Sequence, residues 1–293
     1  ADLAERCEIS DRKAADIIQG ALMLVDAGSF KTEDSVTERR RSARVLRTGS
    51  VAMDHLLDGG VHTRYLTEIY GGSERQKSLM IHQLMANATL PESRGGLDSD
   101  VIFIGSNEDR FQSSMITRIA ERIGADSAEV LKRIHCSTAI SSNHQILLVN
   151  KADKLAKDVG AGLLVVDSFA PHFRNEYIGR GNLAERQQMM NRHLGELREF
   201  AMSNDSVVVL TNEATGSPLK PVGEYLFAHY SAFVLRLSKE KGGKTIINLE
   251  DSPNLPESMA VIRISEDGIS DDTPSQEGNM VRRAPTKKRE RRN

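Results

Sequence analysis

One short segment combines glycines, a lysine and a serine at the spacing of a phosphate-binding loop. It reads Gly71-Gly72-Ser73-Glu74-Arg75-Gln76-Lys77-Ser78, against the general pattern G-x-x-x-x-G-K-[ST]. In such loops backbone N–H groups surround the phosphates, the lysine binds their oxygens, and the hydroxyl holds Mg²⁺. The segment therefore predicts a site for ATP and Mg²⁺ over residues 71–78, with Ser78 as a metal ligand.

Two positions of this loop depart from the pattern. Gln76 replaces the second glycine, where a side chain crowds the phosphates, and Glu74 adds a carboxylate that repels an anionic ligand. On its own, the segment also fits an ordinary turn between a strand and a helix with a surface lysine. The loop alone therefore leaves nucleotide binding open.

A second acidic position supports the nucleotide site. The apolar run 163–166 (LLVV) ends in Asp167, which is the Walker B arrangement, in which a carboxylate at the end of a buried strand holds Mg²⁺ or its waters. A strand followed by an aspartate is common by itself. Together with the loop, it predicts Ser78 and Asp167 as the Mg²⁺ ligands if ATP binds.

Strands that alternate with helices must position these residues. Apolar patterning predicts strands at 65–70, 101–104, 133–136, 163–166 and 207–210, with helices at 77–90, 111–123, 142–157 and 182–203. From residue 230 the pattern is all strand, at 232–238, 244–249 and 259–264, with a hairpin turn at Gly242-Gly243. This order predicts an α/β fold with a mainly parallel sheet and antiparallel edge strands.

The two ends of the chain differ from this core. Residues 1–27 have helical patterning, and 28–45 form a polar linker. Residues 271–293 form a tail expected to be disordered; its segment 281–293 carries +6, so that the rest of the chain carries −8. Such a tail suits nucleic acid or an acidic partner, or serves only solubility. Without a run of 18 apolar residues, no membrane partner is expected.

A longer motif follows Asp167 and identifies a family. The stretch from Asp167-Ser168-Phe169 to Arg186-Gln187 closely resembles the Walker B strand and first DNA-binding loop of archaeal RadA recombinases and their eukaryotic strand-exchange relatives. Further resemblances follow in the family's order, at 48–50, 56–60, 211–212, 242–244 and 251–257. The similarity covers about residues 1–270 and implies a RecA-type ATPase core over 46–270, with 1–27 as part of the family's helix-hairpin-helix domain.

The resemblance also implies roles for individual residues. The family assembles ATP-dependent filaments on single-stranded DNA and exchanges strands. By that likeness, the DNA-binding residues would be Arg174, Tyr177, Arg180 and Arg186. The residues at subunit interfaces would be Phe30, which anchors a polymerisation segment at 28–45, and Asp251, Ser252 and Pro253, which cap the neighbour's ATP.

Several positions depart from the family pattern. The position of the catalytic glutamate holds Asn107, and Glu108 is the candidate that an insertion would bring into that role. Met115 replaces an arginine that stacks on adenine, Glu213 replaces a glutamine that links the γ-phosphate to the second DNA loop, and that loop is short. Each change removes a favourable contact with nucleotide or with the transition state.

These losses fall on the chain's own ATP site more than on parts that serve DNA or a neighbour. The sequence therefore favours a DNA recombination and repair protein of the RadA family, an accessory paralogue with weak or no ATP hydrolysis. It would bind single-stranded DNA, a RadA-type recombinase filament or its own copies. The alternatives are an active ATP-dependent recombinase with a drifted loop, a stand-alone DNA-binding protein, and a protein that keeps the fold only as a scaffold. The archaeal likeness favours the cytoplasm and nucleoid, and a eukaryotic source would favour the nucleus.

Overall fold

A computed structural model describes residues 42–217, 219–230, 233–240, 242–272 and 281–283, together with a few isolated residues before 42. The chain divides into two compact units, Ala1–Ala43 and Arg44–Asn293. Most of the predicted helical segment 1–27, Phe30 and most of the linker 28–45 lie outside the described residues, as does most of the tail. Within the second unit, the strands and helices form one layered domain.

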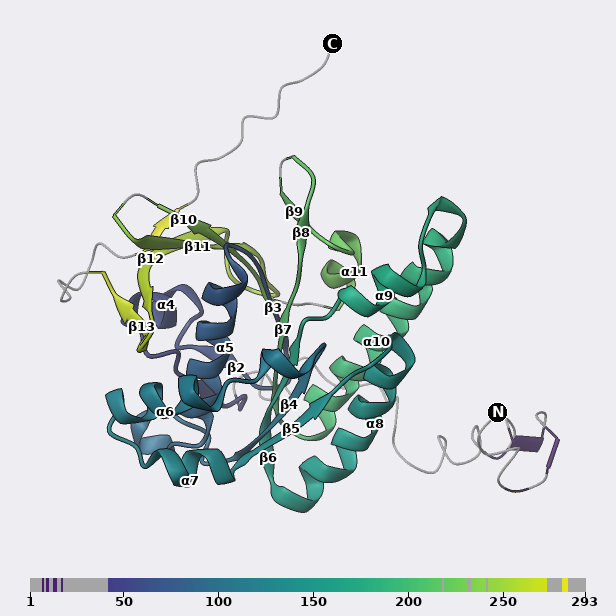
Figure 1. Cartoon of the computed structure of the whole chain (residues 1–293), viewed down its shortest axis with the longest axis horizontal. Helices are drawn as coiled ribbons and strands as arrows, with labels where there is room; N and C mark the ends of the chain where they lie inside the picture. Colours follow the sequence, from purple (N-terminus) through teal and green to yellow (C-terminus); the bar gives the residue numbers. More distant parts are fainter. Residues whose placement is uncertain are drawn as a thin grey trace, which may run out of the picture. The chain divides into compact units, whose positions relative to one another are not determined.

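A large twisted sheet forms the centre of this unit (Figure 1). Its strand order is β13-β12-β11-β10-β3-β7-β6-β4-β5, with β14 also paired to β12. The six strands from β10 to β5 are parallel, and β11 to β14 pair antiparallel. Their bounds are β3 Leu66–Gly71, β4 Asp100–Gly105, β5 Ile134–Thr138, β6 Ala161–Asp167, β7 Val207–Thr211, β10 Phe233–Lys239, β11 Lys244–Asp251, β12 Ser258–Ser265, β13 Gly268–Asp271 and β14 Val281–Arg283.

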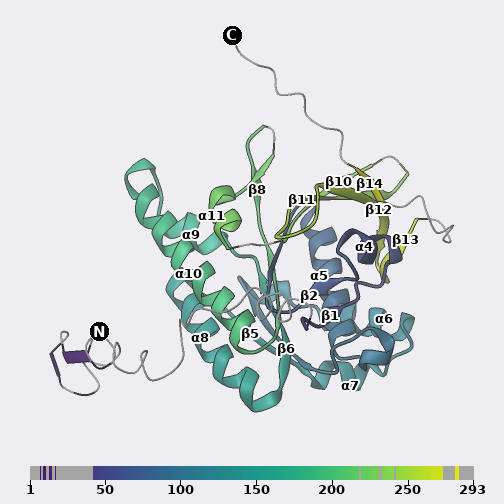
Figure 2. The same ribbon diagram turned by 180° about the vertical axis from the view of Figure 1, so that it is seen from behind.

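Helices cover both faces of the sheet, as the two opposite views show (Figures 1 and 2). One layer contains α4 (Val51–Leu56), α5 (Glu74–Ala88), α6 (Ser113–Arg122) and α7 (Ser127–Lys132); the other contains α8 (Ser142–Val159), α9 (Pro171–Glu176), α10 (Leu183–Ser203) and α11 (Glu224–His229). Two further short pairs are β1 (Val45–Leu46) with β2 (Val61–His62), and β8 (Ala214–Thr215) with β9 (Lys220–Pro221). No described helix is both long and apolar enough to cross a bilayer.

The strand β6 shows how the sequence builds two cores. Leu163 and Val165 lie in the apolar cluster beneath α5 and α6, whereas Leu164 and Val166 lie in the cluster beneath α8 and α10. All four side chains are fully buried. A strand buried on both faces needs a continuous apolar run rather than alternation. The buried strand predicted at 163–166 is confirmed, and it lies between β7 and β4 inside the parallel part of the sheet.

The predicted order of strands and helices is also confirmed, and the mainly parallel sheet ends in antiparallel edge strands as expected. The turn between β10 and β11 contains Gly242 and Gly243, both with positive φ, a conformation that favours glycine. One boundary differs in a way that matters for function. The helix predicted from residue 77 begins at Glu74, inside the loop motif.

Candidate functional site

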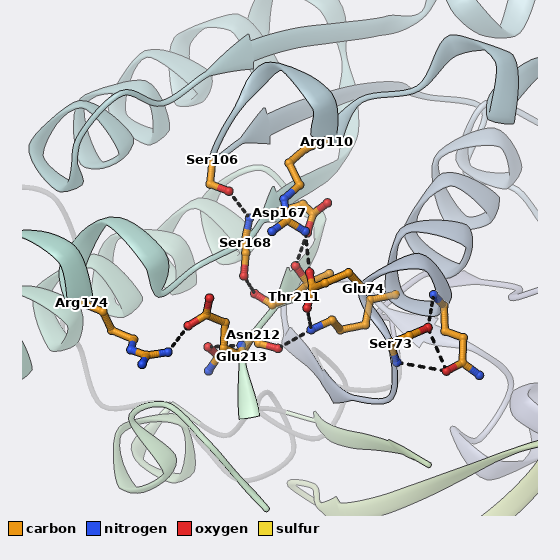
Figure 3. Close-up of polar contacts among 12 residues, drawn as sticks. Ser73, Glu74, Ser106, Arg110, Asp167, Ser168, Arg174, Thr211, Asn212 and Glu213 are labelled. Atoms are coloured by element: carbon orange, nitrogen blue, oxygen red, sulfur yellow. Dashed lines mark hydrogen bonds and ion pairs between the residues drawn. The ribbon is translucent and has the colours of Figure 1, made fainter. Parts of the chain in front are cut away.

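The residues predicted to handle nucleotide meet at one edge of the sheet (Figure 3). Gly71 ends β3, Gly105 ends β4, Asp167 ends β6 and Thr211 ends β7. These four strands are parallel, so their carboxyl ends lie on the same side. Ligands of open α/β sheets bind at that edge, and the structure therefore brings the loop and the Walker B strand together as the sequence predicted.

A capping box closes the start of α5. The Gln76 backbone N–H donates to Ser73 Oγ at 3.3 Å, and the Ser73 N–H donates to Gln76 Oε1 at 3.1 Å. The Gln76 amide nitrogen also donates to Thr245 Oγ1 at 2.8 Å. Two N–H groups that a phosphate loop would turn toward its ligand are therefore bonded within the chain. Gln76 does more than crowd the loop, because it makes the loop the capped first turn of a helix.

The motif lysine is also bonded within the chain. Lys77 is buried, and its Nζ donates to Glu74 Oε1 at 2.6 Å and to the Asn212 carbonyl at 2.9 Å. The other oxygen of Glu74 accepts from Arg110 Nη1 at 2.6 Å. Partial burial of Glu74 opposes its ionisation, but the bonds from Arg110 and Lys77 outweigh it and hold the pKa of this carboxyl below its usual value. Glu74 is therefore an anion bound by two cations.

Asp167 lies beside this group and is fully buried. It accepts a hydrogen bond from Thr211 Oγ1, and Arg110 Nη1 lies 3.6 Å from its Oδ1. Burial raises its pKa, although the Thr211 hydrogen bond and the Arg110 charge act in the opposite direction. Its second oxygen, Oδ2, has no hydrogen-bond partner among the described residues. Asp167 thus offers one free oxygen at the Walker B position.

The residues of the site fit Mg²⁺, but they do not fit the phosphates of ATP. Ser78 and the free oxygen of Asp167 are suitable ligands for a hydrated Mg²⁺. The phosphate cradle does not fit a triphosphate as it is folded, because Glu74 occupies the lysine and Gln76 occupies the loop N–H of Ser73. Among the described residues, no group of three or more His, Cys, Asp and Glu side chains forms a separate metal site.

A cavity of about 330 Å³ lies next to the loop. Its lining comes from the loop, from the connection after β4 and from the start of α6, and consists of Glu74, Arg75, Ser78, Asn107, Asp109, Arg110, Gln112 and Met115. Met115, which replaces the arginine that stacks on adenine in the family, is thus part of a cavity next to the loop. Space for a ligand remains there, although the phosphate cradle beside it is filled.

The structure separates Glu108 from Arg110, two of the three charged residues in the connection after β4. Glu108 lies in the short 3₁₀ turn Glu108–Arg110, and its side chain is exposed. Arg110 instead points into the site, with its side chain only 18% exposed, between Glu74 and Asp167. Sequence reasoning missed Arg110, because the only signal is a basic residue soon after a strand that ends at the site. The catalytic role of Glu108 stays a prediction.

The predicted DNA-binding residues lie on and after α9. Arg174 is paired with Glu213, just beyond the end of β7 (Figure 3). Arg180 is exposed in the 3₁₀ turn Arg180–Asn182, and Tyr177 and Arg186 are partly exposed. The short second loop forms the β8–β9 hairpin. Large exposed apolar side chains flank both loops, at Ile178, Leu183, Leu219 and Tyr225.

The predicted Asp-Ser-Pro interface segment lies at the end of β11. Asp251 is the last residue of that strand and, like Pro253, is exposed. Ser252 Oγ accepts from the Leu255 N–H at 2.7 Å and donates to its carbonyl at 2.8 Å, so the segment is a turn stabilised by its own side chain. A contact with a neighbouring subunit stays a prediction for this segment.

Comparison with known proteins identifies the family. The model of the Rad51 family matches residues 39–272, which is most of the chain. The chain belongs to the Rad51 family. It is also 38% identical over 285 residues to the DNA repair and recombination protein RadA of Methanoculleus marisnigri, an alignment that covers 92% of this chain and 88% of that protein. The resemblance drawn from the motif after Asp167 and the predicted RecA-type fold are confirmed.

Membership in the Rad51 family makes the contents of the loop informative. This member of the family has the lysine, the serine and the Walker B aspartate of a nucleotide site, and they lie at the same edge of the sheet. The same site holds Glu74, Gln76 and Arg110, which bond to these residues or to the loop backbone. Glu74 and Gln76, the two departures in the loop, therefore bond to groups that a phosphate loop would leave free for its ligand.

Proposed function

We propose that this chain is a DNA recombination and repair protein that works as an accessory member of the Rad51 family. It binds single-stranded DNA, a RadA-type recombinase filament or both, and hydrolyses ATP weakly or not at all. The observation that carries the proposal is the contact of Lys77 with Glu74 at 2.6 Å, in a lysine only 3% exposed. This lysine is bound to its own chain at the point where an active loop would bind a phosphate.

The surfaces predicted to serve DNA support the second half of the proposal. Arg180 is exposed, and Arg174, 42% exposed, reaches the surface next to the short hairpin. Arginines on such loops suit phosphate oxygens of a nucleic acid strand. Both arginines reach solvent, whereas Lys77 and the Ser73 N–H are bonded within the chain.

Hydrolysis measured with single-stranded DNA tests this proposal. We expect the purified chain to release phosphate no faster than its Lys77→Ala variant, with or without DNA, while it binds DNA or co-sediments with recombinase filaments. Glu129→Gln, on the exposed face of α7, serves as the control for an unrelated carboxylate. Hydrolysis that depends on both DNA and Lys77 contradicts the proposal.

An active recombinase is the second candidate. The free oxygen of Asp167 and the nearby Ser78 favour it, because together they offer what a hydrated Mg²⁺ needs. Under this candidate Glu74 leaves Lys77 when ATP arrives. Strand exchange by the chain alone, dependent on ATP and abolished by Asp167→Asn, would establish it.

A further inference from the structure

Two charged side chains lie where a phosphate loop holds its ligands. In such a loop the lysine amine contacts phosphate oxygens, and the Walker B carboxylate faces the metal cation. Here the amine of Lys77 contacts the carboxylate of Glu74, and the carboxylate of Asp167 faces the guanidinium of Arg110 at 3.6 Å. Glu74 also bonds to Arg110, so that one anion and one cation fill the site together.

We propose that Glu74 and Arg110 are a built-in substitute for the triphosphate and its Mg²⁺, which closes the site against nucleotide. Glu74 takes the place of a phosphate oxygen, and Arg110 takes the place of the cation. The chain therefore keeps its site assembled without nucleotide, and its DNA loops stay in place whether or not ATP is present. The statement about the DNA loops rests on the proposed function; the statement about the site does not.

The four charged side chains of the site balance one another without a ligand. Lys77, Glu74, Arg110 and Asp167 follow one another in space with alternating sign, and their charges sum to zero if all are ionised. Lys77 is 3% exposed and Asp167 is fully buried, so little water screens these two charges, whereas Glu74 is 55% exposed. A triphosphate would bring several negative charges next to Glu74 and Asp167. It would also have to break both bonds of Glu74.

Short contacts connect this group to the DNA loops. Lys77 donates to the Asn212 carbonyl, and the Asn212 side-chain oxygen accepts from the Glu213 N–H at 2.8 Å. The carboxylate of Glu213 then pairs with Arg174 on α9. The residues at the end of β7 thus touch the substituted phosphate site on one side and a predicted DNA-binding arginine on the other (Figure 3). No step in this chain of contacts needs a bound nucleotide.

Thermal unfolding with and without Mg·ATP tests the substitution directly. We expect no rise in the Tm of the wild-type protein. In Glu74→Gln we expect a lower Tm without nucleotide and a rise when Mg·ATP is added, because a ligand that binds only the folded state stabilises it. Removal of one like charge about 4 Å from a phosphate corresponds to roughly a tenfold to thousandfold gain in affinity. Calorimetric titration measures that gain.

The matched control is Glu129→Gln. Glu129 pairs with Lys132 at 2.6 Å, with the same i,i+3 spacing as Glu74 and Lys77, but both side chains are at least 65% exposed. It should change neither Tm nor nucleotide binding. If Glu74→Gln does not fold, Glu74→Ala provides the second variant, since it also removes the negative charge and alanine suits the first turn of a helix. A wild-type Tm raised by Mg·ATP overturns the proposal, and so does a folded Glu74 variant that gains no affinity.

Fluorescence anisotropy of a labelled single-stranded oligonucleotide tests the part of the proposal that concerns the DNA loops. Wild-type binding curves should coincide in Mg·ATP, in Mg·ADP and in EDTA. A wild-type affinity that depends on nucleotide overturns the proposal. If the protein does not bind DNA at all, the DNA part of the proposed function fails, whereas the unfolding experiment still decides whether Glu74 substitutes for phosphate.

Discussion

Replacement of Lys77 by methionine tests whether the motif lysine now stabilises the fold. Methionine keeps the length and packing of the buried stem and removes only the ammonium. The variant loses charge-assisted hydrogen bonds to Glu74 at 2.6 Å and to the Asn212 carbonyl at 2.9 Å. Such bonds contribute about 1.5–3 kcal/mol each to the free energy of unfolding, and a buried carbonyl left unpaired costs about 1–3 kcal/mol.

Two effects reduce this sum. Glu74 is about half-exposed, so in the variant its carboxylate is hydrated and stays paired with Arg110. The variant also has no ammonium, so the cost of burying that charge is removed. A net loss of about 2 kcal/mol remains. For a domain of this size, that corresponds to a fall in Tm of about 4–8 °C. Differential scanning calorimetry without any nucleotide measures it.

Lys132→Met is the control for this prediction. Its pair with Glu129 has the same spacing and distance, but the lysine is 69% exposed, and exposed pairs contribute little. We expect its Tm to equal that of the wild type. A lysine retained only for nucleotide would add nothing to the nucleotide-free Tm. Equal Tm values for Lys77→Met and the wild type would therefore refute the reasoning.

Two further predictions concern other parts of the unit. Arg174→Gln should weaken binding of single-stranded DNA and lower the slope of log affinity against log salt concentration by about 0.7. Glu213→Gln should strengthen binding because it releases Arg174. Anisotropy titrations over a range of NaCl concentrations measure both effects, and an unchanged slope for Arg174→Gln would count against a phosphate contact. Burial lowers the pKa of His82 from 6.5 to about 4, despite a hydrogen bond to the Ser78 carbonyl. The unfolded state therefore binds the proton more tightly than the folded state does. The stability contributed by neutral His82 is complete above pH 6.5 and is lost as the pH falls toward 4, by about 2 kcal/mol between pH 7 and pH 5. Urea unfolding of His82→Gln should show a shallower pH dependence than that of the wild type.

Much of the fold could be predicted from the sequence because the sheet leaves a direct pattern. A strand buried on both faces requires a run such as 163–166, and a hairpin turn with positive φ favours a pair such as Gly242-Gly243. The short helices α7, α9 and α11 left no comparable pattern. Each has only six residues, too few turns for an amphipathic repeat to stand out.

The site was predicted in its location but not in its contacts. The loop and Asp167 were identified because spacing along the chain identifies them. The place of Arg110 depends on how the connection after β4 folds back between Glu74 and Asp167. Local spacing contains no information about such a contact between separate elements. Glu74 was expected to repel a ligand, and the structure adds that it binds the lysine itself.

The two unusual residues of the loop have one structural explanation. Ser73 and Gln76 form the S-x-x-Q signature of a capping box, and Glu74 places a negative charge in the first turn of α5, where the helix dipole favours it. The changes that remove a glycine-rich phosphate cradle thus supply the signals that begin a helix. A phosphate loop keeps its N–H groups free for a ligand, whereas a helix start that caps itself uses them. Restoring glycine at Gln76 alone would remove the cap and still leave Glu74 on Lys77. The two substitutions therefore act as a pair, with Gln76 closing the backbone of the loop and Glu74 closing its lysine.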